Sequence, residues 1–149
     1  MKTVSKVLLA VMLLSACGLA QDTAALRKAE ITPQALVSLM RSNTASKLLI
    51  LNVGPKMLYM QAHILGSEYV GAGSEPSGIA ALRERVKNLP KNKAIVLYCG
   101  CCPWDRCPNI RPAFAELQKL GFSNVKVLYI ADNIGSDWVD KGYPTTRGR

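Results

Sequence analysis

The sequence predicts an α/β fold in which helices cover both faces of a central, mainly parallel sheet. Continuous apolar runs at 48–53, 94–98 and 125–130 predict three buried strands, because strands that are buried on both faces carry such runs. Segments with helical apolar spacing alternate with these runs, and that alternation is typical of a parallel sheet. Ligands of such sheets bind beyond the carboxyl ends of the strands. Chemistry is therefore expected where these strands end.

The first half of this pattern begins with a helix and continues through a strand. Thr32 is placed to cap the helix, and Pro33 occupies its first turn, where the missing N–H of proline costs little. The apolar run at 48–53 then ends at a Gly-Pro pair, which favours a turn. A short helix at 56–63 and a brief extended piece around 68–70 are expected next.

The second half repeats the alternation of helix and strand. After a loop at 71–78 that is rich in Gly, Ser and Pro, apolar residues recur at helical spacing; these are Ile79, Leu82, Val86 and Leu89. A further helix is expected from 110 to 120, with Asn109 as its N-cap and Gly121 as its C-terminal glycine. A final short helix is expected to carry Trp138.

The first twenty residues have the composition of an export signal. Lys2 and Lys6 precede an apolar run at 7–14 that is too short for a comfortable membrane span. The sequence Leu14-Ser15-Ala16-Cys17 resembles the lipobox of bacterial lipoproteins, and cleavage there would leave Cys17 lipidated. Small residues at 18–20 would also suit an ordinary signal peptidase. We therefore expect an exported protein that is periplasmic or lipid-anchored in a bacterial membrane.

Removal of the signal peptide at 1–20 leaves a linker at 21–30 and one domain at 31–149. The formal net charge of +9 falls to about +7 when the two lysines of the leader are lost. The remaining basic residues are scattered, whereas nucleic-acid binding needs a concentrated patch. We expect a monomer without a nucleic-acid partner, and a small anionic ligand suits its charge.

Four of the five cysteines lie in one segment between a predicted strand and a predicted helix; they are Cys99, Cys101, Cys102 and Cys107. The N–H groups of such a loop and the following helix N-terminus favour a thiolate or a bound anion. In an oxidising compartment, an even number of cysteines permits two disulfides. It equally permits a reactive thiol with resolving partners, or a metal site. The residues alone leave these three interpretations open.

Several segments, taken in order, resemble the single-domain rhodaneses, a family of sulfurtransferases. The matching pieces are Leu51-Asn52-Val53-Gly54, His63-Ile64-Leu65-Gly66-Ser67, the run from Leu89 to Cys99, Leu120 to Val125, and Trp138 with Lys141-Gly142-Tyr143-Pro144. This resemblance implies a rhodanese-like fold over about residues 31–146. Two features depart from the family pattern. Asn52 and Gly54 replace the usual Asp and Arg, and a longer loop with three additional cysteines replaces the short cradle that follows the family's cysteine.

The resemblance implies that Cys99 is the nucleophile. In the family, this cysteine takes a sulfane sulfur from an anionic donor such as thiosulfate, becomes a persulfide, and passes the sulfur to a thiol or to cyanide. Arg106 and Arg111 are the candidate residues for binding the anionic donor, and no cofactor is expected. His63, within its family segment, is interpreted as structural.

The additional cysteines have two further interpretations. Cys101, Cys102 and Cys107 would resolve the sulfur chemistry of Cys99 or form disulfides, and a bridge between Cys102 and Cys107 would brace the loop. Alternatively, the protein is a non-catalytic module of the same fold. In that case its loop binds a thiophilic metal through Cys99, Cys101, Cys102 and Cys107, or exchanges disulfides.

Overall fold

The computed structural model describes residues 24–42 and 47–148. The predicted signal peptide, both of its cleavage sites and Cys17 lie outside these residues. Within the described part of the chain, a central sheet has five strands in the order β1-β6-β5-β2-β4. Their bounds are Glu30–Ile31 (β1), Leu48–Asn52 (β2), Glu68–Tyr69 (β4), Ala94–Tyr98 (β5) and Val125–Leu128 (β6). Every neighbouring pair runs parallel.

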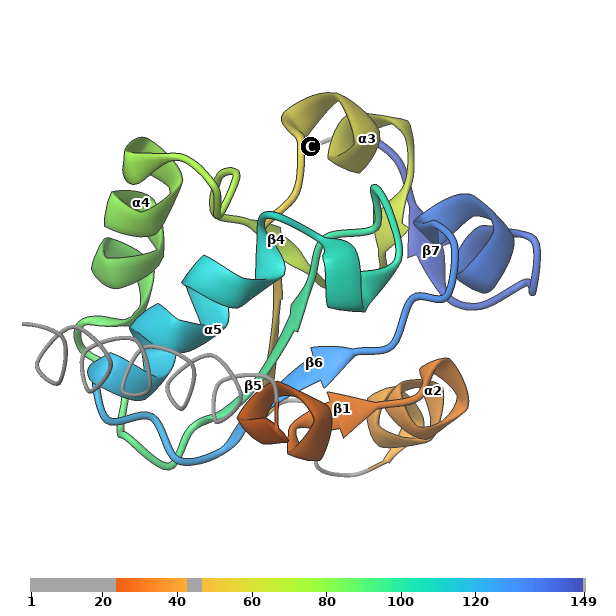
Figure 1. Ribbon diagram of the computed structural model, residues 1–149. Helices are drawn as coiled ribbons and strands as arrows, with labels where there is room; N and C mark the ends of the chain where they lie inside the picture. The colour runs from red at the N-terminus through yellow and green to blue at the C-terminus, as the bar shows by residue number, and fades with distance from the viewer. Residues whose placement is uncertain (1–23, 43–46, 149) are drawn as a thin grey trace, which may run out of the picture.

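Helices cover both faces of this sheet. Their bounds are Pro33–Arg41 (α2), Lys56–Gln61 (α3), Pro76–Val86 (α4) and Ile110–Lys119 (α5). Figure 1 shows α4 and α5 side by side on one face, with α2 and α3 on the other. The predicted fold class, a mainly parallel α/β sheet between helical layers, is confirmed. No helix among the described residues has the length and apolarity needed to cross a membrane.

Two residues that were expected to end helices, one at an N-terminus and one at a C-terminus, do so in the structure. The side-chain oxygen of Thr32 accepts a hydrogen bond of 3.2 Å from the backbone N–H of Ala35, so Thr32 caps α2 ahead of Pro33. At the end of α5, Gly121 has a φ of 84°. That left-handed conformation favours glycine at a helix C-terminus.

The segment that was interpreted as a linker contributes to the domain. Residues 24–28 form a short helix, and β1 pairs in parallel with β6. Leu26 and Ala29 are buried in the same core as the central strands. The packed domain therefore includes residues from 24 onward.

A second, two-stranded sheet lies outside the central one. His63–Ile64 (β3) pairs antiparallel with Thr145–Thr146 (β7). Between β6 and β7, Gly135–Val139 forms one π-helical turn (η3) that carries the fully buried Trp138. The indole N–H of Trp138 donates to the carbonyl oxygen of Pro144 at 3.0 Å. This bond fixes the approach of the chain to β7.

Candidate active site

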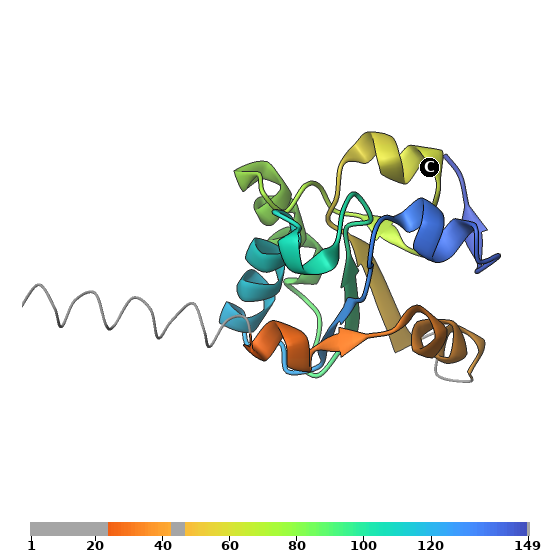
Figure 2. The ribbon, with the colours of Figure 1, turned by 45° about the vertical axis from the view of Figure 1, so that its right-hand side comes forward.

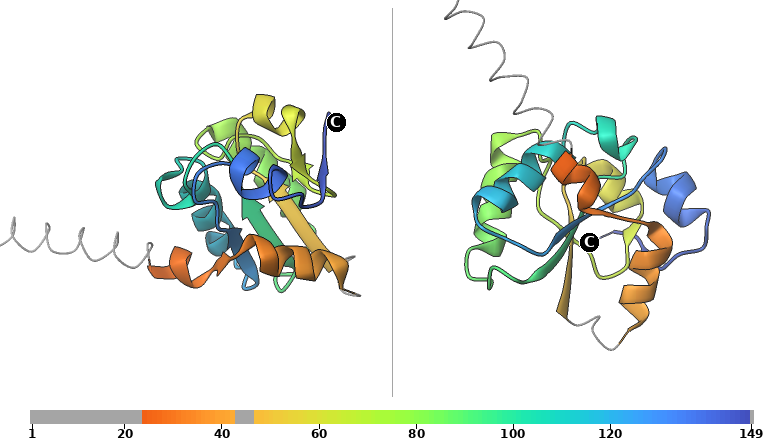
Figure 3. Two further views of the ribbon diagram at one scale, coloured as in Figure 1. Left: turned by 90° about the vertical axis from the view of Figure 1, so that its right-hand side faces the viewer. Right: turned by 60° about the horizontal axis from the view of Figure 1, so that its bottom comes forward.

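Cys99 follows β5 directly, at the carboxyl end of the central sheet. Figure 3 shows β5 beside β2, and Figure 2 shows the cysteine-bearing loop at the end of the sheet toward which β2 points. The backbone N–H of Val53 donates to the Tyr98 carbonyl oxygen at 2.9 Å, which extends the pairing of the two strands to their ends. The Cys99 side chain is buried. The site predicted at the ends of the strands is therefore anchored to two paired strands in the interior of the sheet.

The two residues that depart from the family pattern both contact Cys99. The side-chain amide of Asn52 donates to the Cys99 carbonyl oxygen at 3.3 Å and accepts from the Gly54 N–H at 3.0 Å. A Cβ atom on Gly54 would lie 2.5 Å from the Cys99 carbonyl oxygen and 2.9 Å from its Sγ. Glycine is therefore required at position 54, because the backbone just after β2 passes directly against the cysteine.

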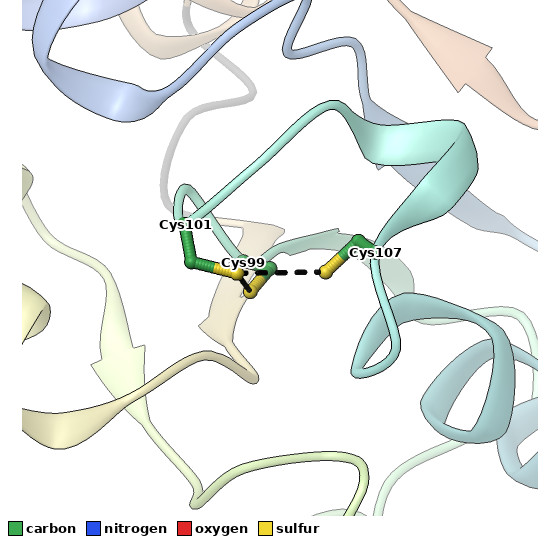
Figure 4. Close-up of side chains that lie close together, drawn as sticks. All are labelled: Cys99, Cys101 and Cys107. Carbon is green, nitrogen blue, oxygen red and sulfur yellow. Dashed lines mark hydrogen bonds between the residues drawn. The ribbon is translucent and has the colours of Figure 1, made fainter.

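Three sulfur atoms cluster at this point, as Figure 4 shows. Cys101 Sγ lies 3.1 Å from Cys99 Sγ and 4.0 Å from Cys107 Sγ. The sulfur atoms of Cys99, Cys101 and Cys107 all lie within 4.8 Å of one another. Cys102 Sγ lies 3.0 Å from Cys101 Sγ, and all four residues are free thiols. Three of the four loop cysteines therefore form a sulfur cluster, and Cys102 lies next to it.

The backbone of the loop explains this clustering. Gly100 has a φ of 83°, which turns the chain so that Cys101 folds back toward Cys99. A 3₁₀ turn at Trp104–Arg106 (η2) then returns the chain toward the sheet at Cys107. Trp104 is buried, and its backbone N–H donates to the Ile130 carbonyl oxygen at 2.9 Å. The longer loop is therefore packed onto the domain through Trp104.

Within the cluster, Cys107 is the cysteine whose pKa is lowered. A hydrogen bond from the Cys99 thiol, together with the backbone N–H groups of Asn109 and Ile110, lowers the pKa of Cys107 to about 5 although burial opposes the shift. The same hydrogen bond, followed by burial, raises the pKa of Cys99 well above its usual range. Cys107 precedes the N-terminus of α5, where N–H groups and the helix dipole favour an anion. The pair is thus a thiolate at Cys107 beside a neutral thiol at Cys99.

Asn109 supports Cys99 instead of capping α5. It occupies the N-cap position, but its side chain makes no capping bond. Its amide N–H donates to Cys99 Sγ at 3.3 Å, while its amide oxygen accepts from the Ser74 N–H at 3.0 Å. Asn109 is thus the N-cap residue, as expected, but its side chain does not cap the helix. Its amide instead bonds to Cys99 Sγ and to the backbone of the loop before α4.

The two arginines predicted from the sequence lie around the loop. The guanidinium group of Arg111 donates to the Asp105 carbonyl oxygen at 3.1 Å. Arg106 is exposed and lines a cleft of about 280 Å³ together with Arg27 and Glu30. Their roles in donor binding stay predictions.

A different cleft opens onto the sulfur cluster. It has a volume of about 690 Å³ and is lined by Gly100, Cys101, Ile134 and Arg147, among others. Arg147 is the cation among its lining residues, and it follows β7 directly. Sequence reasoning missed this residue, because its placement depends on the pairing of β7 with β3, two short strands that lie far apart in the sequence.

His63 has the structural role expected of it. Its Nδ1–H donates to the Tyr59 carbonyl oxygen at 2.7 Å, and its ring stacks on the Tyr59 ring with centroids 3.8 Å apart. The side chain is buried.

The charge on Cys107 gives a testable pH dependence. Because its pKa is lowered, we expect a thiolate absorbance in the near ultraviolet that persists at neutral pH and disappears as pH falls through about 5. Cys107→Ser should remove this transition, whereas Cys102→Ser should retain it. A transition that stays near the pKa of an ordinary thiol in the wild type would contradict the assignment.

Comparison with known proteins identifies the family of this domain. The family model of the rhodanese-like domain matches residues 32–129, more than half of the chain. This chain belongs to the rhodanese-like family. Its loop of four cysteines is the atypical part of this rhodanese-like domain. No curated protein matches the sequence significantly.

Solved structures share the fold of this rhodanese-like domain. BH2092 protein from Bacillus halodurans is 21% identical with a TM-score of 0.60, and the match covers 87% of this chain and 85% of that one. Alr3790 protein from Anabaena sp. is 22% identical with a TM-score of 0.60, covering 79% and 92%. A persulfide form of EanB in a tetrahedral intermediate state with ergothioneine is 23% identical with a TM-score of 0.59. That match covers 79% of this chain but 28% of EanB.

Proposed function

We propose that this rhodanese-like domain is a sulfurtransferase that carries sulfane sulfur as a persulfide on Cys99. The donor is a small anion such as thiosulfate, and the acceptor is a thiol or cyanide. The observation that carries the proposal is the Cys99 thiol at the end of β5, held against the Cys107 thiolate. A persulfide is also named for EanB, a part of which has a similar fold.

The arrangement supplies what the first step needs. The Cys99 thiol and the Cys107 thiolate share one proton along their hydrogen bond, and when that proton lies on Cys107, Cys99 Sγ attacks the outer sulfur of thiosulfate. A new S–S bond forms on Cys99, the S–S bond of thiosulfate breaks, and sulfite leaves with its electron pair. The Asn109 amide, which donates to Cys99 Sγ, stabilises the negative charge on that sulfur as the proton departs.

Arg147 is the proposed contact for the anionic donor. It lines the same cleft as Cys101, so its positive charge attracts an anion into the cleft that holds this sulfur atom. Arg106 and Arg111 remain proposals for the same task from the other side of the loop.

Intact-protein mass spectrometry tests the sulfurtransferase proposal. Reduced wild-type protein that is mixed with thiosulfate and excess cyanide together should release sulfite and form thiocyanate over many turnovers, because excess cyanide takes the sulfur directly from the persulfide. The sulfur should be traced to Cys99 in peptides from quenched samples. Protein that releases no sulfite from thiosulfate, and takes no sulfur from any other sulfane donor, would overturn the proposal. The same mass, measured on protein from its native host, reports whether Cys17 carries the lipid proposed for an exported protein.

One observation favours a second candidate function, a site for a thiophilic metal ion. Cys99, Cys101 and Cys107 place three sulfur atoms within 4.8 Å of one another. Three thiolates suit a soft ion such as Cu(I). In this alternative the domain binds metal and does not transfer sulfur.

Metal titration tests this second candidate. Reduced protein under anaerobic conditions should retain one Cu(I) per chain against a competing chelator. Cys107→Ser should lose this ion, while Cys102→Ser should keep it. Equal retention by both variants, or none by the wild type, would exclude the three-sulfur site.

A further inference from the structure

Cys101 lies directly beside the cysteine that would carry the proposed persulfide. Its Sγ lies 3.1 Å from Cys99 Sγ, and the φ of 83° at Gly100 brings the two side chains together. Cys99 is only 4% exposed, whereas Cys101 is partly exposed and lines the cleft of about 690 Å³. An acceptor from solution therefore meets Cys101 before it reaches the carrier sulfur.

We propose that Cys101 resolves the Cys99 persulfide inside the protein, releasing sulfide and leaving a disulfide between Cys99 and Cys101. This inference rests on the proposed sulfurtransferase function and adds the fate of the sulfur. The final acceptor then becomes a dithiol reductant, which reduces the disulfide and restores both thiols.

The step balances without any further reactant. Cys101 Sγ attacks Cys99 Sγ, and its proton passes to the outer sulfur of the persulfide. The bond between Cys99 Sγ and the outer sulfur breaks, and its electron pair leaves with that sulfur as HS⁻. The sulfane sulfur is reduced to sulfide, while the two cysteine sulfur atoms are oxidised to the disulfide.

The geometry selects Cys101 over the other two cysteines. Cys107 holds its charge through the backbone N–H groups of Asn109 and Ile110, which keep its sulfur at the start of α5. Cys102 lies near Cys101, but it is not part of the three-sulfur cluster. A bond between the adjacent residues Cys101 and Cys102 would also be strained, since disulfide geometry is restrictive.

A single-turnover experiment tests the proposal. Reduced wild-type protein, Cys101→Ser and the matched control Cys102→Ser each receive thiosulfate with no thiol and no cyanide present. Sulfite, sulfide and the intact mass are then measured. We expect every protein to release about one equivalent of sulfite. Wild type and Cys102→Ser should also release one equivalent of sulfide, and their mass should fall by two hydrogen atoms. Cys101→Ser should release no sulfide and keep the mass of one added sulfur.

The outcomes separate this proposal from the sulfurtransferase function itself. If wild type releases sulfite but retains the added sulfur, Cys101 is not a resolving residue although the domain transfers sulfur. Sulfide release by Cys101→Ser at the wild-type yield overturns the proposal in the same way. If no protein releases sulfite, the sulfurtransferase function fails, and the resolving step fails with it.

Discussion

Cys99→Ser is expected to abolish sulfur acceptance from thiosulfate, with a loss of turnover of at least about 10³-fold. A serine hydroxyl at this position stays protonated at neutral pH, and the Cys107 thiolate is too weak a base to activate it. The variant should therefore release no sulfite from thiosulfate and keep the mass of the untreated protein. Sulfite release measured under substrate saturation gives the size of the loss.

The fold should tolerate this substitution, so that lost activity reports lost chemistry. Serine is close in size to cysteine, and its hydroxyl oxygen can still accept from the Asn109 amide that now donates to Cys99 Sγ. Cys102→Ser is the matched control, since it removes a sulfur atom from the same loop but leaves the three-sulfur cluster. Wild-type turnover by Cys99→Ser would refute the assignment of the nucleophile.

Gly54→Ala is expected to impair both folding and turnover. The added Cβ would lie 2.5 Å from the Cys99 carbonyl oxygen, which belongs to the backbone at the end of β5. Neither central strand can move away without breaking its pairing, so the overpacking should lower the free energy of unfolding by about 1–3 kcal/mol. Urea denaturation measures that loss. Turnover should fall as well, because the same Cβ lies 2.9 Å from Cys99 Sγ.

Gly135→Ala provides the matched control. A Cβ there meets only the side-chain oxygen of Asn133, at 2.9 Å. That oxygen accepts from the Ser136 N–H, and the loss of this bond, about 1 kcal/mol, is offset by the preference of a helical turn for alanine over glycine. Its free energy of unfolding should stay within about 0.5 kcal/mol of the wild type. Equal stability of the two variants would show that the approach of Gly54 to Cys99 is not a tight contact.

The long buried strands of this fold could be predicted from the sequence, whereas its two-residue strands could not. The apolar run at 94–98 coincides with β5, and the run at 48–53 contains β2, because buried parallel strands leave an unambiguous signal. The two-residue strands β3 and β7 have too few residues for any periodicity. A helix was expected to continue to His63, where β3 begins. These short strands depend on tertiary pairing, which no local pattern encodes.

The candidate site also has features that the sequence predicts and features that depend on the folded structure. The position of Cys99 was predictable because it follows a buried strand. A thiolate in this loop was also predictable, because the loop precedes the N-terminus of a helix. Which cysteine carries that charge could not be predicted, because it depends on the hydrogen bond between Cys99 and Cys107. The turn of Asn109 toward Cys99 Sγ likewise arises only once the loop before α4 holds the other end of its amide.

The pairing of β3 with β7 has a consequence for the rate at which substrate reaches the sulfur cluster. Arg147, at one wall of the cleft, is held in place by this ladder of two residue pairs and by a bond from the Gly148 N–H to the Met60 carbonyl oxygen. So short a ladder opens at far lower free energy than the central sheet. Transient fraying of this ladder is expected to move Arg147 away from the cleft, which would widen the cleft and remove its positive charge together. The width of the cleft and its attraction for an anionic substrate would then both depend on the opening of the β3–β7 ladder. Amide hydrogen exchange at Thr145 and Thr146 would measure that opening.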